Sequence, residues 1–185
     1  GWVPPDAELL AVLRPLPGCP ALAMDTESDS LHHHREKVCL VQIASDRGES
    51  WLLDPLGGLD PRPLAPLLAD PAVAKVFHGA DYDVTTLKRD FGFTFGNVFD
   101  TMIASRVLGR PEIGLQALLR TEFGVALAKD SQKDDWSRRP PTPTQEPYPL
   151  ADVAHLIPLH DRLVAALQEL GRLEWAREEC AAVAA

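Results

Sequence analysis

Residues 21–27, ALAMDTE, form a short apolar run that ends in two acids. This run predicts a strand with Asp25 and Glu27 at its end. Residues i and i+2 of a strand point to the same face, so the two carboxylates are expected to project together. Neighbouring carboxylates repel each other unless a cation or a proton joins them. The pair therefore indicates either a cation site or, because more polar residues follow, a solvated acidic turn.

The other predicted elements extend outward from this run. Strands are predicted over residues 38–44 and 50–55, at a spacing that allows antiparallel connections, and over 74–79 and 97–100. Helices are predicted over 6–13, 63–70, 83–92, 101–109 and 113–124, and the pattern is helical from about 150 to 182. Strands come first and then alternate with helices. This order predicts an α/β fold, in which helices cover one mixed sheet.

Length and composition predict one domain over residues 1–185, with no additional domain expected. The chain is 45% hydrophobic, enough for a sizeable core, and it lacks both a membrane-length apolar run and an N-terminal export leader. Cys19, Cys39 and Cys180 are far apart in the sequence, which excludes a disulfide framework or a zinc pattern. Reduced thiols are typical of a cytoplasmic protein, and that location is expected here.

Three further side chains are candidates for chemistry alongside the first pair. Asp83, in KVFHGADYDV, is a metal ligand or an acid that interacts with a helix N-terminus. Tyr148 and Asp152, in YPLAD, are spaced i, i+4 and share one face of a helix, although a tyrosine there can also simply pack on the surface. Together, four separated acids and a tyrosine fit a two-metal phosphodiester site, because Mg²⁺ and Mn²⁺ prefer carboxylate oxygens.

These motifs resemble the ribonuclease D branch of the DEDD 3′→5′ exonucleases, the DEDDy subgroup. The three motifs are AMDTESD, KVFHGADYDVTTLKRDFG and YPLADVAHLIPLHDRL, and the segments CLVQIA, LLDPL, FDTMIASRVLG and KDSQKDDWSRRP between them are also similar to the family. The resemblance covers about residues 3–170. It implies a ribonuclease-H-like mixed sheet, antiparallel in its first strands and parallel in its later ones, flanked by α-helices.

The resemblance also implies a role for each of the five side chains. Asp25 would bridge two divalent cations, Mg²⁺ or Mn²⁺. Glu27 and Asp152 would complete the tighter ion site, and Asp83 would hold the second ion largely through water. Tyr148 would orient the attacking water or hydroxide. The implied reaction is hydrolysis at a single-stranded or frayed RNA 3′ end, which releases nucleoside 5′-monophosphates.

Candidate substrate contacts follow from the same resemblance. Lys129, Gln132 and Trp136 would lie near the substrate, because a cation can meet a phosphate and an indole can stack on a base. The alternative for Trp136 is a core or interface anchor. His78 would face the terminal nucleotide or be a packed, hydrogen-bonded histidine. Thr26, inside the first motif, completes the set. A metal role is not expected for the three consecutive histidines at residues 32–34.

The third motif departs from the family pattern, because Pro147 and Pro149 flank the tyrosine. A proline inside a helix removes a backbone hydrogen bond, and the residue before a proline is pushed away from the helical region. A break or kink is therefore predicted near residues 146–149. It would alter the distance between Tyr148 and Asp152.

Two alternatives to an exoribonuclease remain open. A DNA exonuclease would use the same acids, because the contact that recognises the 2′-hydroxyl of RNA is not legible in the sequence. A non-catalytic nucleic-acid-binding or protein-binding module would not need to keep five active-site residues. The formal net charge of −9 counts against tight electrostatic binding of a long nucleic acid. It is compatible with an enzyme that grips only a few nucleotides at a 3′ end.

Overall fold

The computed structural model describes residues 1–13, 18, 20–29, 36–126, 135–137, 139 and 153–185. Within these ranges, one mixed sheet has the strand order β3-β2-β1-β4-β5. Its strands are β1 (Ala21–Ser28), β2 (Val38–Ser45), β3 (Ser50–Leu53), β4 (Ala74–Phe77) and β5 (Val98–Asp100). The first three pair antiparallel, whereas β4 runs parallel to β1 and β5 parallel to β4. The predicted mixed sheet is confirmed.

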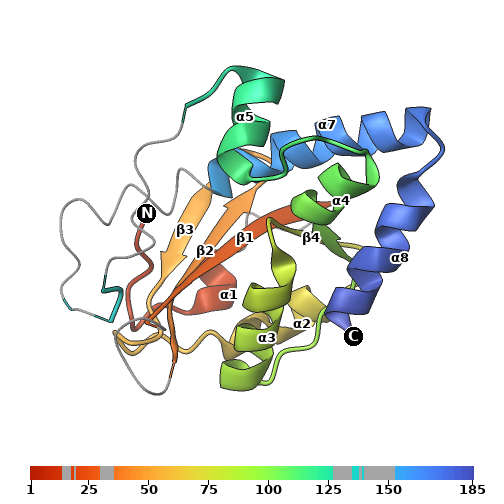
Figure 1. The fold of residues 1–185 in the computed structure, drawn as a ribbon. Coiled ribbons are helices and arrows are strands. Elements are labelled where there is room, and N and C mark those ends of the chain that lie inside the picture. The colour runs from red at the N-terminus through yellow and green to blue at the C-terminus, as the bar shows by residue number, and fades with distance from the viewer. Residues whose placement is uncertain (14–17, 19, 30–35, 127–134, 138, 140–152) are drawn as a thin grey trace.

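Helices cover both faces of this sheet (Figure 1). One face carries α1 (Leu9–Val12), a 3-10 turn (Arg62–Leu64), α2 (Ala65–Ala69) and α3 (Ala80–Phe91). The other face carries α4 (Thr101–Val107), α5 (Leu115–Phe123) and α7 (Leu156–Glu169). The last helix, α8 (Leu173–Ala184), lies along the β5 edge and contributes side chains to both cores. None of the described helices is long and apolar enough to cross a membrane.

The alternation of side chains along β1 divides the core into two layers. Leu22 and Met24 point into the layer of α1, α2 and α3, and Ala21 and Ala23 point into the layer of α4, α5 and α7. Successive strand residues face opposite sides of a sheet, so the row of alanines continues through Asp25 to residue 27. The two acids therefore extend the face of the sheet on which α7 packs.

Several predicted boundaries were wrong, including that of the helix expected over residues 6–13, which spans only Leu9–Val12. Two others concern the candidate site and the C-terminal helices. The helix expected over residues 83–92 begins earlier, at Ala80, so Asp83 lies within the first turn of α3. The helical pattern expected from about 150 to 182 is interrupted within its described part, between α7 and α8. Gly171 adopts a φ of 66°, and the Arg172 amide donates back to the carbonyl of Leu167 at 2.8 Å. This left-handed glycine ends α7 and turns the chain into α8.

Asp100, the last residue of β5, holds the first turns of two helices. Its side chain is buried, with 1% of the residue exposed. Its carboxylate accepts hydrogen bonds from Met102 at 2.8 Å at the start of α4, and from Gly79 at 3.0 Å and Ala80 at 2.8 Å at the start of α3. Since α3 carries Asp83, this cap fixes the helix that positions that candidate ligand.

Replacing Asp100 with alanine is expected to destabilise the fold by about 3 kcal/mol, because it removes two helix caps and leaves buried amides without acceptors. Urea denaturation followed by circular dichroism measures the change. Asp60→Ala is the matched control, because the Asp60 carboxylate also accepts a backbone hydrogen bond, from Arg62, but lies on the surface. Its denaturation midpoint should stay near that of the wild type. Equal midpoints for the two variants would contradict the role assigned to Asp100.

Candidate functional site

The end of β1 places two acids side by side on one face of the sheet. Asp25 is half-buried and Glu27 is buried. In the antiparallel pairing with β2, they lie opposite Gln42 and Leu40. The register of the two strands shifts directly after Glu27. Such irregularities re-aim a strand, so the pairing changes at the point where the acids end.

Thr26 links this strand to Asp83 on α3. Its backbone amide donates to Asp25 Oδ1 at 2.9 Å, and its hydroxyl donates to Asp83 Oδ1. One residue therefore bonds to two of the predicted metal ligands, which come from different elements. The substrate contact expected of Thr26 stays a prediction, and the structure shows that its hydroxyl is used within the fold.

Asp83 is buried, and its carboxyl group is shifted toward the neutral form. Burial raises the pKa of Asp83 to about 7, and the nearby charge of Asp100 adds to the rise. The hydrogen bonds from Thr26 act in the opposite direction but are outweighed. A divalent cation at this carboxylate would reverse the effect, because it is the largest local charge in such a site. The environment of Asp83 thus favours a proton or a cation.

The donor set fits a hard divalent cation, since Asp25, Glu27 and Asp83 offer carboxylate oxygens. Within the part of the chain that the structure describes, no three His, Cys, Asp or Glu side chains form a complete metal-binding group. Asp152, the fourth predicted ligand, lies outside that part, as do Tyr148, Lys129, Gln132, residues 32–34 and the break predicted near 146–149.

The structure corrects the substrate contact expected of Trp136. This residue is 2% exposed and packs with Leu40 and Cys39. Arg139 holds the segment around Trp136 against β2. Its guanidinium donates to the Trp136 carbonyl at 2.7 Å, to the Cys39 carbonyl at 3.0 Å and to Asp54 Oδ2 at 2.8 Å. An indole packed in this way offers no free face to a base, so Trp136 is the core anchor of the alternative interpretation.

His78 is half-buried and hydrogen-bonded within the fold, and the substrate contact expected of it stays a prediction. Its Nδ1 lies 2.8 Å from the Thr101 hydroxyl, which itself donates to the Phe77 carbonyl at 3.1 Å. Burial lowers the pKa of His78, and a hydrogen bond to the backbone of Ile113 opposes this only in part. The imidazole thus ties the end of β4 to α4 and to the chain before α5, as the packed alternative proposed.

Sequence analysis missed Gln42, which lies opposite Asp25 on β2. The available signal was a lone amide inside the otherwise apolar run VCLVQIA. It also missed Arg139, whose bonds depend on tertiary packing and leave no sequence signal.

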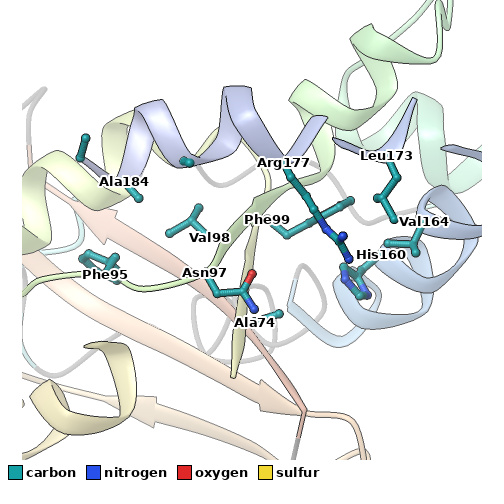
Figure 2. A pocket seen from close by; sticks show the side chains of 12 residues that line it. Ala74, Phe95, Asn97, Val98, Phe99, His160, Val164, Leu173, Arg177 and Ala184 are labelled. Carbon is teal, nitrogen blue, oxygen red and sulfur yellow. The ribbon is translucent and has the colours of Figure 1, made fainter. Parts of the chain in front are cut away.

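A separate cavity of about 520 Å³ lies between β5, α7 and α8 (Figure 2). Phe99, His160 and Arg177 line it, and Ala74 and Val98 border it from the amino ends of β4 and β5. The acids lie at the carboxyl end of β1, which runs parallel to β4. The cavity is therefore at the opposite end of the sheet and does not belong to the acidic site.

Comparison with known proteins agrees with this arrangement. The profile of a family described as 3′-5′ exonuclease matches residues 1–168. The chain belongs to this family. Within it, the chain is ribonuclease D-like, being 34% identical to ribonuclease D of Acidiphilium cryptum over 95% of this chain and 45% of that protein. The crystal structure of Escherichia coli RNase D, an exoribonuclease, superposes with a TM-score of 0.90 at 30% identity, over 99% of this chain and 49% of that one.

Similar solved structures also include Brucella melitensis NrnC. Its structure with bound Mg²⁺ has a TM-score of 0.77 at 27% identity, over 89% of this chain and 81% of that one. Its complex with pGG has a TM-score of 0.79 at 29% identity, with the same coverage. This chain spans less than half the length of both ribonuclease D relatives above. The likeness therefore concerns the exonuclease domain of those longer proteins.

Asp83→Asn should remove a pH-dependent loss of folding stability from the metal-free protein. The pKa of Asp83 is about 7 in the fold against 3.8 for an ordinary aspartate, so the fold binds the proton more tightly than the unfolded chain does. The contribution of this residue to stability is therefore present below about pH 4 and is lost as the pH rises toward 7. Urea denaturation in EDTA at pH 5 and pH 8 should show the variant gaining stability relative to the wild type at pH 8. A difference that does not change with pH would contradict the buried, protonated Asp83.

Proposed function

We propose that this chain is a divalent-metal-dependent 3′→5′ exoribonuclease with ribonuclease D-like activity. The observation that carries the proposal is the bonding of Thr26 to both Asp25 and Asp83. It joins the acids of the first two motifs at the end of one strand. Membership of the exonuclease family supports the same reaction.

The cofactor we propose is a pair of Mg²⁺ or Mn²⁺ ions, held by Asp25, Glu27, Asp83 and Asp152. The Mg²⁺ in the related NrnC structure supports a divalent cation here. When bound, such ions supply an activated water at neutral pH and neutralise charge on the attacking and leaving oxygens.

The residues of the chain would prepare this chemistry. Thr26 holds the Asp83 carboxylate at the end of β1, and Asp83 gives up its proton when the cation binds. The burial of Glu27 and Asp83 limits competition from bulk water. Tyr148, by family resemblance, would orient the attacking water. Hydrolysis would then break the last phosphodiester bond and release a nucleoside 5′-monophosphate.

The substrate we propose is a single-stranded or frayed RNA 3′ end in the cytoplasm. The names of the ribonuclease D relatives support RNA, and the pGG bound to NrnC supports a short contact with nucleotides. A net charge of −9 suits brief contact rather than tight binding of a long duplex. Both described cysteines, Cys39 and Cys180, are free and buried, which agrees with a reducing compartment.

A degradation assay tests the proposed activity directly. RNA and DNA of the same sequence, labelled at the 5′ end, are incubated with Mn²⁺, Mg²⁺ or EDTA. The expected result is a metal-dependent ladder that shortens from the 3′ end, faster on RNA. Faster cleavage of DNA would make the chain a DNA exonuclease. Metal binding without cleavage of either polymer would favour a non-catalytic binding module.

Asp25→Asn and Asp83→Asn should each lower kcat/KM by more than about 100-fold. Loss of even an outer partner of a metal ligand costs 10–100-fold, and these variants alter the ligands themselves. The control is Asp81→Asn, since Asp81 lies exposed in the same helical turn as Asp83. Its kcat/KM should match the wild type. A comparable loss of kcat/KM in all three variants would show that the negative charge of this region, and not metal binding by Asp25 and Asp83, supports turnover.

A further inference from the structure

Gln42 is a buried amide in the middle of the sheet. It lies on β2 with 0% of the residue exposed, and neither its side-chain nitrogen nor its side-chain oxygen has a hydrogen-bond partner among the residues that the structure describes. Its cross-strand neighbours are Asp25 on β1 and Leu52 on β3. Leu40 and Ala44, two residues away on either side of β2, share its face of the sheet.

An amide in this position destabilises the fold when no group bonds to it. Buried side-chain polar groups in native proteins nearly always have a partner, so an exception needs an explanation. The neighbours on β2 are apolar, so an apolar side chain of the same length would avoid the cost of burying an unpaired amide. Packing of the metal-free fold therefore gives no reason for a glutamine at this position.

Asp25 is the polar group that faces Gln42 most directly. Residues opposite each other in an antiparallel pair point to the same face, with their Cβ atoms about 5 Å apart. A carboxamide can donate two hydrogen bonds to a carboxylate or to a water between them, and its oxygen can accept one from that water. The Gln42 amide therefore has the hydrogen-bond donors needed to hold the Asp25 carboxylate in one orientation.

We propose that Gln42 is a positioning residue for Asp25. When a divalent cation binds, the Gln42 amide donates to the Asp25 carboxylate, directly or through one water, and holds it in the ligating orientation. The inference rests on the proposed function only in that Asp25 binds a cation. It assigns to β2 a part in the proposed metal site, alongside β1 and α3.

Gln42→Met tests this role, because methionine has a similar length and shape but no amide. Mn²⁺ binding is measured by calorimetry, thermal unfolding is measured in EDTA, and RNA cleavage is followed as Mn²⁺ is raised. Mn²⁺ affinity should fall about 10–100-fold. The metal-free variant should unfold at the wild-type temperature or above. The Mn²⁺ concentration for half-maximal cleavage should rise, with kcat recovering at saturating Mn²⁺.

The matched control is Ile43→Val, on the same strand but facing the opposite core. It should lower the unfolding temperature and leave Mn²⁺ affinity unchanged, as a merely structural change would. Gln42→Leu repeats the test with a second apolar side chain. Unchanged Mn²⁺ affinity in both Gln42 variants would overturn the inference. Lower stability or loss of folding in EDTA in both would also overturn it, because the amide would then support the metal-free fold. If the wild type bound no Mn²⁺, the proposed function itself would fail.

Discussion

Burial of two carboxylates, those of Asp83 and Asp100, is the constraint on which the rest of the molecule depends. The negative charge of Asp100 contributes to the raised pKa of Asp83. The fold satisfies Asp100 with backbone amides from the first turns of α3 and α4. The carboxyl group of Asp83 receives hydrogen bonds from Thr26 among the described residues, and its pKa stays high. One buried acid therefore organises the helices, and the other is left to bind a proton or a cation.

Stability and function draw on different residues of the same strands. Small alanines on β1 and β2 let α7 pack closely on the sheet, and the opposite face is filled by larger aliphatic side chains. At the end of the alanine row, the chain places Asp25 and Glu27, and opposite them the unpartnered amide of Gln42. Local violations of good packing are expected where a protein does its chemistry. These violations cluster at the end of β1, which is independent support for locating the site there.

Periodicity predicted the parts of the site that depend on local geometry. The two acids of β1 share a face because side chains alternate along a strand, and Asp83 follows β4 because a helix begins there. The local sequence does not show whether a side chain packs within the fold or faces a substrate. Trp136 is buried and His78 half-buried because each meets residues distant in the sequence, Cys39 and Leu40 for Trp136 and Thr101 for His78. The amide of Gln42 was overlooked for a related reason, since only the register of β2 places it against Asp25.

The proposed metal site would reconcile the negative charge of the chain with a polyanionic substrate. The chain carries nine excess negative charges at neutral pH, and its described surface ion pairs mostly neutralise each other locally. Nucleic-acid affinity normally comes from basic side chains that replace condensed counterions. Under the proposed function, divalent cations at the acids would be the main positive charge that the last phosphodiester of an RNA 3′ end meets. Substrate binding and catalysis would then share one requirement, which would limit unproductive binding along the length of the polymer.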